Sequence, residues 1–230
     1  MKKIDLYADG PTLSEIKTLE NIDGYTFNPS LFKKLNAKDY IKFTEEILKL
    51  TRGKSVSIEV FGDDEVTCYK QAKKITSLSD KISVKIPITY TNGKFTTNLI
   101  SKLISENIKL NITAIFTLEQ IKEINNIVKN TNTILSVFAG RLFDIGIDAN
   151  EKLKEISEYT HSNSKCRILW ASCRQPYDYI NAINSSSDII TMGPSMIKKL
   201  KNLNSITPED YSKETVKNFY EDAKSSGFKI

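Results

Sequence analysis

The chain has 230 residues, of which 40% are hydrophobic and 27% are charged, and its 33 basic and 28 acidic residues give a net charge of +5. This composition is ordinary for a globular protein, and the length suits one α/β core. Because the basic residues are scattered and form no basic block or aromatic-interleaved motif, we expect no nucleic-acid partner. The small basic excess suits an anionic substrate but does not by itself predict one.

The sequence has no apolar run near the roughly 18 residues that a membrane helix needs, so we expect no membrane partner. The start, Met1-Lys2-Lys3, resembles the charged part of a secretion signal, but Asp5 and Asp9 interrupt the segment that follows. Because no apolar signal core is found there, we expect a cytoplasmic protein.

The cysteine and histidine contents argue against a metal centre. Cys68, Cys166 and Cys173 are odd in number and show no CxxC spacing, so we expect reduced thiols in the core or at the surface. The single histidine, His161, follows a helical segment and is interpreted as a solvated loop residue. One histidine argues against a His-ligated metal site and against a Ser-His-Asp triad. We expect no metal and no other cofactor.

Short β-branched runs alternate along the chain with amphipathic stretches of helical period. The predicted strands, in chain order, are Ile4–Ala8, Gly24–Phe27, Ser55–Val60, Ile82–Ile86, Leu110–Ile115, Thr133–Phe138, Arg167–Ala171 and Asp188–Thr191. The main helices predicted between them are Ala37–Leu50, Asp64–Thr76, Thr117–Val128, Asn150–Tyr159 and Pro176–Asn184. Eight strands with helical crossovers predict a parallel sheet, and eight is also the number that closes a barrel.

A doubly wound open sheet is the competing topology. It would be favoured by a glycine-rich turn after the first strand, but the residues there are Asp9-Gly10-Pro11-Thr12, and no GxGxxG or P-loop occurs in the chain. We therefore predict an α/β protein with a (β/α)8 TIM barrel fold, formed by a single domain over residues 1–230.

The end of the chain has a different pattern. Thr207-Pro208-Glu209-Asp210 provides a helix cap, a first-turn proline and an acid at the capping-box distance. These residues predict a helical arm over about residues 207–225, with no strand after it. Tyr211, Val216, Phe219 and Tyr220 are available for packing, so the arm is expected to cover the barrel or to hold a neighbouring subunit. We expect a homo-oligomer.

In a parallel barrel the carboxyl ends of the strands converge on one mouth, so polar residues at those ends are candidate site residues. Asp9 closes the first strand, and the alternative is a capping acid for a helix over residues 11–19. Asn28 follows the second strand in Asn28-Pro29-Ser30, which is also typical of a turn and a helix start. The local sequence leaves both alternatives open.

Two charged residues lie within apolar strands, where an unpaired charge is costly. Glu59 lies in Ser57-Ile58-Glu59-Val60, and Lys85 lies in Val84-Lys85-Ile86-Pro87. A structural Lys85–Glu59 ion pair is one interpretation. The functional interpretation is that desolvation and nearby cations lower the pKa of Lys85, which frees its amine to attack a carbonyl and form an imine.

Further polar residues lie on and after the later strands. Asn111 and Thr113 point to one side of strand five by the two-residue period. Strand six carries Ser136 and Phe138, with Arg141 just beyond, and strand seven is followed by Ser172 and Arg174. Two Ser-then-Arg pairs at neighbouring strand ends would form a phosphate clamp, although either pair alone is more often a surface feature.

Several segments, in order, resemble the transaldolase and fructose-6-phosphate aldolase family. They are Gly24–Ser30 (GYTFNPS), Val84–Thr89 (VKIPIT), Leu110–Thr113 (LNIT), Ser136–Arg141 (SVFAGR), Ala171–Arg174 (ASCR) and Ser187–Thr191 (SDIIT). Asn-Pro-Ser and Lys-Ile-Pro are each common, but the ordered set is specific and spans nearly the whole chain. The resemblance implies a class I aldolase-type barrel whose Schiff-base lysine lies on strand four, where Lys85 stands.

The resemblance also implies roles for the other candidates. Asp9 would be the acid/base that handles the donor hydroxyl during carbon–carbon cleavage, and Glu59 and Thr113 would hold a catalytic water. The remaining candidates would bind the phosphorylated sugar. Asn28, Asn111 and Ser172 would contact the dihydroxyacetone unit, Arg141 and Arg174 would hold the phosphate, and Thr26, Ser136 and Phe138 would complete the substrate pocket.

The family contains transferases and aldolases, and three positions favour a transferase. Within the resemblance, glutamate at position 59, serine at 136 and phenylalanine at 138 are of the transaldolase kind, with glutamine and tyrosine typical of the aldolases at 59 and 138. Gly10-Pro11 and Thr26-Phe27 depart from the family pattern and could reshape the donor end of the pocket. An aldolase for a specialised ketose phosphate is therefore the alternative, and a non-catalytic sugar-phosphate-binding protein is a third.

Overall fold

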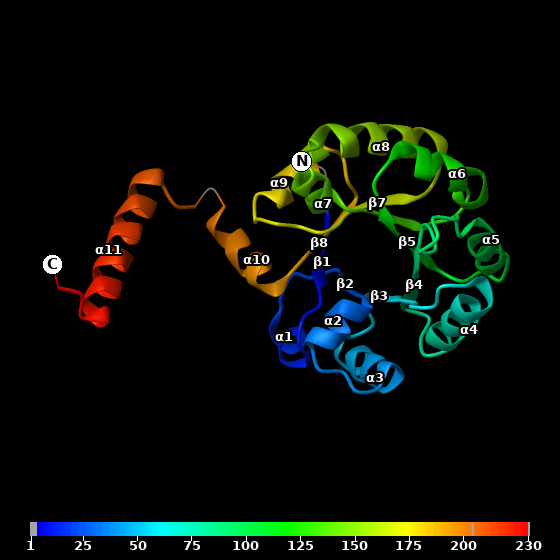
Figure 1. Ribbon diagram of the computed structural model, residues 1–230, viewed down its shortest axis with the longest axis horizontal. Helices are drawn as coiled ribbons and strands as arrows, with labels where there is room; N and C mark the ends of the chain where they lie inside the picture. Colours follow the sequence, from blue (N-terminus) through cyan, green and yellow to red (C-terminus); the bar gives the residue numbers. More distant parts are fainter. Residues whose placement is uncertain (1–3, 204, 230) are drawn as a thin grey trace.

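The computed structural model describes residues 4–203 and 205–229. Its core is a closed barrel of eight parallel strands in chain order, in which β8 pairs with β1 (Figure 1). The strands are β1 (Asp5–Asp9), β2 (Gly24–Phe27), β3 (Ser55–Glu59), β4 (Ile82–Pro87), β5 (Leu110–Ile115), β6 (Ile134–Val137), β7 (Arg167–Trp170) and β8 (Ile189–Met192). The predicted TIM barrel is confirmed, and each predicted strand corresponds to an observed one.

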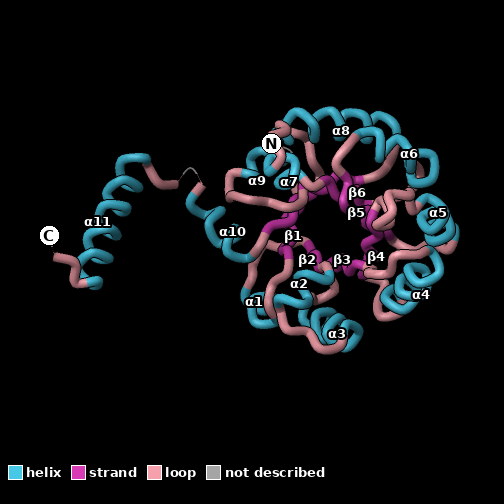
Figure 2. The backbone as a smooth tube through the Cα atoms, viewed as in Figure 1, coloured by secondary structure: helices cyan, strands magenta, loops and turns pink. Residues whose placement is uncertain are grey.

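The helices form a ring outside the strands, and the last helix stands apart from that ring (Figure 2). They are α1 (Leu13–Thr18), α2 (Pro29–Lys34), α3 (Tyr40–Leu50), α4 (Glu65–Thr76), α5 (Thr97–Ser105), α6 (Leu118–Val128), α7 (Ala139–Asp144), α8 (Ala149–Asn163), α9 (Asp178–Asn184), α10 (Pro194–Lys199) and α11 (Pro208–Ser226), with a 3₁₀ turn at Leu200–Asn202. Helices α2 and α7 are short additional helices that follow β2 and β6 directly.

The two faces of each strand pack against different parts of the protein. On β4, Val84 and Ile86 are fully buried and belong to the large apolar cluster between barrel and helices. A separate, smaller cluster that includes Tyr7 and Leu169 fills the barrel interior. A Cβ atom on Gly24 would lie 2.6 Å from the Tyr7 ring, so β2 needs glycine at this point to admit that ring. This apolar layer lies below the inward polar residues near the carboxyl ends of the strands, while at the amino ends the inward-facing Asp5 and Arg167 form an ion pair of 2.7 Å.

The structure excludes one alternative left open for Asp9 and corrects the expectation for His161. Helix α1 is capped by Thr12, whose hydroxyl accepts from the backbone N–H of Glu15, and Glu15 returns the bond in a capping box. Asp9 is therefore not the helix cap. His161 lies in the last turn of α8 rather than in a loop, and its Nε2 is 2.8 Å from Asp188 Oδ2. The thiol prediction is confirmed in its buried form, since Cys68, Cys166 and Cys173 are free and buried.

Helix α11 begins as the sequence predicts, with Thr207 accepting from the backbone N–H of Asp210, and it ends at Ser226 before Gly227. None of its residues is buried, and Tyr211, Val216, Phe219 and Tyr220 are each more than 60% exposed. The helix extends away from the barrel (Figure 1), so it does not cover its own mouth. Within residues 4–203 and 205–229, no helix combines the length and apolarity needed to cross a membrane.

Candidate active site

A pocket of about 200 Å³ opens at the carboxyl ends of the strands. It contains most of the residues that the sequence singled out, which come from β1, β2, β4 and β6 and from the segments after β2, β6 and β7. These are Asp9, Thr26, Asn28, Lys85, Ser136, Phe138, Arg141, Ser172 and Arg174. Ala171, Cys173, Thr191, Gly193 and Met196 complete the lining. The candidates that do not line it are Glu59, Asn111 and Thr113, which lie beside it on β3 and β5.

Lys85 is 5% exposed and lies near the top of β4, inside the barrel. Its Nζ is 3.1 Å from Glu59 Oε2, and the two residues are partners in the β3–β4 register. The ion pair that was one interpretation of these residues is therefore present. The same contact places a carboxylate beside the only amine that lines this pocket within the described chain.

Asp9 is the last residue of β1, and it lines the pocket. Its Oδ1 accepts from the Thr26 hydroxyl at 2.6 Å, and Thr26 Oγ1 is also 2.6 Å from Thr191 Oγ1. Burial raises the pKa of Asp9 above its usual value, while the positive charge of Lys85 and the hydrogen bond from Thr26 oppose that rise. A carboxyl whose pKa is raised by burial can exchange protons nearer neutral pH, as general acid–base work requires.

Asn28 is both a helix cap and a pocket residue, so the two interpretations that the sequence left open are compatible. Its Oδ1 accepts from the backbone N–H of Leu31 at 2.9 Å and so caps α2, and the residue also lines the pocket. The cap holds the side chain at the mouth. Its amide nitrogen makes none of these capping bonds and can donate to a ligand hydroxyl.

Asn111 lies fully buried below the pocket and is held from two strands. Its Nδ2 donates to Ser57 Oγ on β3 (3.1 Å), and its Oδ1 accepts from Ser136 Oγ on β6 (2.7 Å). Thr113 is also buried, and its hydroxyl has no hydrogen-bond partner among the described residues. The next residue, Ala114, has φ +58°, where the β5–β6 pairing is irregular. Such irregularities redirect side chains near functional sites.

Arg141 and Arg174 lie on the same side of the mouth because the first turn of α7 and the loop after β7 approach each other closely. A Cβ atom on Gly140 would lie 1.7 Å from the carbonyl oxygen of Ser172, which itself has φ +63°. Only glycine permits this approach. The Arg141 guanidinium lies 5.1 Å from the centroid of the Phe138 ring, and both side chains line the pocket.

Arg174 is not free, which the sequence did not predict. Its guanidinium forms two hydrogen bonds to the carboxylate of Asp144 at the end of α7, and both side chains are half exposed. Its backbone N–H donates to Asp178 Oδ2 (2.7 Å). Asp178 is buried, and it also accepts from the backbone N–H of Gln175. These two carboxylates hold the side chain and the backbone of one arginine at the rim.

Sequence reasoning missed four contributors to this site: Asp144, Asp178, Ser57 and Thr191. Thr191 could have been found, because it is the polar residue near the end of β8 and the same strand-end argument applies to it. Ser57 lies two residues before Glu59 and shares its face of β3. No local signal marks Asp144 or Asp178 as partners of Arg174.

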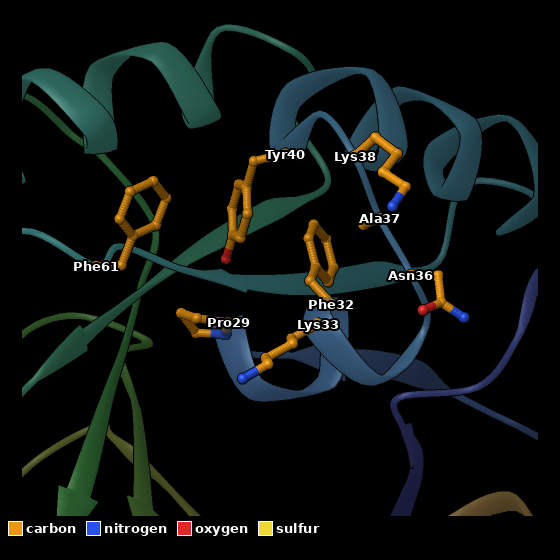
Figure 3. Close-up of a pocket in the computed structure, with 8 residues that line it drawn as sticks. All are labelled: Pro29, Phe32, Lys33, Asn36, Ala37, Lys38, Tyr40 and Phe61. Carbon is orange, nitrogen blue, oxygen red and sulfur yellow. The ribbon is translucent and has the colours of Figure 1, made fainter.

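A larger cavity, of about 490 Å³, is lined by α2, the segment between α2 and α3, the first residue of α3, and Phe61 after β3 (Figure 3). The rings of Phe32, Tyr40 and Phe61 gather along it, with Lys33 and Lys38 also in its lining. None of the predicted site residues lines it. Tyr40 forms the link to the barrel, because its hydroxyl donates to the backbone carbonyl of Glu59 at 2.6 Å, and burial raises its pKa.

The described residues contain no cluster of three or more His, Cys, Asp or Glu side chains arranged to hold a metal ion. The polar groups that line or border the pocket include an amine, carboxylates, hydroxyls and guanidiniums. A buried amine next to carboxylates suits carbonyl chemistry, and two rim arginines suit an anionic substrate.

Comparison with known structures supports the fold. A thiamine phosphate pyrophosphorylase from Pyrococcus furiosus aligns with a TM-score of 0.58 at 12% identity, over 86% of this chain and 94% of that one. A tryptophan synthase α subunit from Campylobacter jejuni aligns with a TM-score of 0.57 at 16% identity, over 87% and 90% of the two chains. At such identities these likenesses concern the fold alone.

Comparison of sequences is more specific. A probable transaldolase from Ruegeria sp. (strain TM1040) is 30% identical over 224 residues, covering 97% of this chain and 96% of its own. A probable transaldolase from Thermoplasma volcanium is 35% identical over 201 residues, covering 85% and 86%. The family model described as transaldolase/fructose-6-phosphate aldolase matches residues 6–230. The chain therefore belongs to the transaldolase/fructose-6-phosphate aldolase family.

Proposed function

We propose that this protein is a transaldolase. It transfers a dihydroxyacetone unit from sedoheptulose 7-phosphate or fructose 6-phosphate to an aldose phosphate through an imine on Lys85. The observation that carries the proposal is the buried Lys85 amine at the base of a pocket rimmed by Arg141 and Arg174 and flanked by the carboxylates of Asp9 and Glu59. Family membership supports an enzyme of this class.

The reaction begins at Lys85. Its unprotonated amine adds to the ketone carbon of the donor, and loss of water gives a protonated imine, so the ketone oxygen leaves as water. Asp9 then takes the proton from the donor's C4 hydroxyl, and the C3–C4 bond breaks. Its electron pair moves into the iminium, which gives an enamine on Lys85, and the aldose phosphate leaves with a new carbonyl. Addition of the enamine to an acceptor aldehyde reverses these steps, with Asp9 returning the proton.

Imine formation and hydrolysis need a water and a proton carrier close to the Lys85 nitrogen. Glu59 is within ion-pair distance of that nitrogen. The Thr113 hydroxyl is buried on the neighbouring strand β5 and has no hydrogen-bond partner in the part of the chain that the structure describes. We assign to these two residues the water that enters and leaves at the imine carbon, and to Glu59 the proton transfers.

The sugar lies between Lys85 and the rim. In this proposal Asn28, Asn111 and Ser172 contact the hydroxyls of the dihydroxyacetone unit, and Thr26, Ser136 and Phe138 shape the pocket around it. The phosphate lies at Arg141 and Arg174, where charge-assisted hydrogen bonds favour a dianion. Of these assignments, that of Asn111 depends on its remaining N–H, because one amide hydrogen and the carbonyl oxygen are already engaged by Ser57 and Ser136.

We favour a transferase over an aldolase because of the residues at three positions: Glu59, Ser136 and Phe138. A phenyl ring at 138 carries no hydroxyl that could orient water toward the enamine. An aldolase for a specialised ketose phosphate is the second candidate, favoured by the departures at Gly10-Pro11 and Thr26-Phe27 near the donor end. A non-catalytic sugar-phosphate-binding protein is the least favoured, because binding alone has no use for a buried amine between two carboxylates.

We also propose that the chain is a single barrel domain with a helical arm and that it forms a homo-oligomer through α11. Val216, Phe219 and Tyr220 share one face of this helix by their spacing of three and four residues, and all are exposed. A helix that exposes such a face needs a partner surface. A role in pentose phosphate and related carbohydrate metabolism in the cytoplasm follows from the proposed substrates.

One assay separates the candidates. The protein is incubated with fructose 6-phosphate, with and without erythrose 4-phosphate, and the release of glyceraldehyde 3-phosphate and the formation of sedoheptulose 7-phosphate are followed. A transaldolase gives turnover that requires the acceptor, with one heptulose formed per triose released. Acceptor-independent release of free dihydroxyacetone at a similar rate indicates the aldolase. Absence of any product would contradict the transaldolase and would leave the specialised aldolase and the binding protein as the candidates.

A further inference from the structure

We infer that Thr191 is a positioning residue for the reaction: through Thr26 it fixes Oδ1 of Asp9, so that Oδ2 is the oxygen that exchanges the proton with the substrate. This inference rests on the proposed function, in which Asp9 is the acid/base. It adds the assignment of the reacting oxygen and of a residue on β8 that controls it.

The three side chains belong to three successive strands of the closed barrel. β1 pairs with β8 on one side and with β2 on the other, so Asp9 lies between Thr191 and Thr26 in the strand order. Thr26 is 1% exposed and Thr191 is 5% exposed. The oxygens form an unbranched row: Thr191 Oγ1 to Thr26 Oγ1 at 2.6 Å, then Thr26 Oγ1 to Asp9 Oδ1 at 2.6 Å.

Counting protons fixes the direction of this row. A hydroxyl has one hydrogen, and the Thr26 hydrogen is donated to Asp9 Oδ1. At its contact with Thr191, Thr26 must therefore accept, and Thr191 must donate. With Asp9 ionised, every hydrogen in the row has an acceptor, and each donor polarises the next, which strengthens the bond that ends on the carboxylate.

The same count identifies the oxygen that carries the proton when Asp9 is protonated. A proton on Oδ2 leaves both threonine bonds as they are. A proton on Oδ1 would reverse the whole row and turn the Thr191 hydrogen away from Thr26, toward a new acceptor. The row therefore favours protonation at Oδ2. Asp9 can take up and return a proton there without any rearrangement of Thr26 or Thr191.

Other groups around Asp9 set the background for its titration. Lys85 on β4, itself paired with Glu59 on β3, and Arg141 and Arg174 at the rim line or border the same pocket. Cys173 lies in the loop after β7, and its Sγ donates to the backbone carbonyl of Thr191 at 3.2 Å, which fixes that residue's backbone. Burial raises the pKa of Asp9 and works against its basic form. The hydroxyl row opposes this effect without adding a charge.

The test compares variants at both threonines. Thr191→Val removes the donor but keeps the shape, Thr191→Ser keeps the donor, and Thr26→Val removes the bond to the carboxylate itself. Thr160→Val serves as control, because Thr160 is buried in α8 away from the mouth and its hydroxyl has no hydrogen-bond partner within residues 4–203 and 205–229. For each variant we measure kcat for transfer between pH 4 and 9, the yield of borohydride-trapped imine on Lys85, and the thermal midpoint.

We expect Thr191→Val to move the acidic limb of the kcat profile upward by on the order of half a pH unit, since its effect passes through one intervening hydroxyl, and so to lower kcat by about 3-fold on that limb. Thr26→Val should move that limb further, by about one unit or more. Trapping of the imine should be as complete in Thr191→Val as in the wild type, because Asp9 acts after the imine forms. Thr191→Ser and Thr160→Val should match the wild type.

The inference is overturned if Thr191→Val keeps the wild-type kcat and acidic limb, or if Thr191→Ser shifts that limb as much as Thr191→Val does. If Thr191→Val does not fold, Thr191→Ala supplies the hydroxyl-free variant and is judged by the same criteria. Failure of the proposed function has a different signature: the wild-type protein itself then traps no imine and transfers no dihydroxyacetone.

Discussion

The carbonyl oxygen of Ser172 lies 1.7 Å from the place where a Cβ atom on Gly140 would be. This approach joins the first turn of α7 to the loop after β7, and it therefore sets the spacing of the two rim arginines. Any side chain at position 140 must push these two segments apart. The backbone contact, rather than the arginines alone, defines the side of the mouth where we propose that the phosphate binds.

Gly140→Ala is expected to destabilise the protein by about 1–3 kcal/mol, as overpacking in a tight site usually does. It should also raise KM for fructose 6-phosphate while leaving KM for dihydroxyacetone nearly unchanged, because the displaced loops carry the phosphate side only. Chemical denaturation and steady-state kinetics on both donors test this. Equal loss on the two donors would contradict the assignment of these loops to the phosphate.

Arg141→Ala and Arg174→Ala should each lower kcat/KM for fructose 6-phosphate by about 10- to 150-fold, since a hydrogen bond to a charged group contributes about 1.5–3 kcal/mol. The unphosphorylated donors dihydroxyacetone and fructose are the internal control, because they carry no phosphate that an arginine could bind. Comparable losses on both kinds of donor would mean that the arginines are structural, as the Arg174–Asp144 ion pair also allows.

Glu59→Gln should slow transfer by roughly 10²–10⁴-fold, the usual contribution of general acid–base catalysis. Phe138→Tyr should raise aldolase turnover relative to transfer, because a phenol hydroxyl at this place can orient water toward the enamine. The ratio of free dihydroxyacetone to sedoheptulose 7-phosphate measures both effects. If neither substitution changes that ratio, the preference for a transferase loses its main support.

Replacing Val216 and Phe219 together by aspartate should reduce the assembly to smaller species, because it places two charges on the apolar face of α11. Asn218→Asp is the matched control: at 100° per residue it lies about 200° from Val216 around the helix, and it adds charge without touching that face. Light scattering gives the molar mass, and circular dichroism shows that the barrel is still folded. An unchanged mass in the double variant would exclude α11 as the subunit contact.

The sequence predicted the barrel because its signals are local. Runs such as Leu110–Ile115 alternate with helical stretches, and Thr207 with Asp210 marks the start of α11. The strand-end argument also brought Asp9, Lys85 and Arg141 to one mouth. The sequence could not predict the contacts that form only when the barrel closes and its helices and loops pack together. The Asp144–Arg174 pair joins α7 to the loop after β7, and His161 meets Asp188 from the last turn of α8.

The helix-cap alternative for Asp9 also arose because local sequence does not show contacts between strands. An acid two residues before Pro11 is a reasonable helix cap on local evidence. It is the pairing of β1 with β2 that brings the Thr26 hydroxyl to its carboxylate instead, while Thr12 caps the helix. The fold-determining signals were therefore readable one element at a time, whereas the partners of each site residue depended on neighbours far away in the sequence.

Trapping of the imine on Lys85 is the most direct test of the proposed mechanism. The protein is incubated with fructose 6-phosphate and sodium borohydride, digested, and mapped by mass spectrometry, alongside Lys85→Met and, as control, Lys94→Met, which alters an exposed lysine in the loop after β4. We predict a reduced three-carbon adduct on Lys85 in the wild type and in Lys94→Met, and neither adduct nor transfer in Lys85→Met. A Lys85→Met protein that is still labelled and active would contradict the central claim.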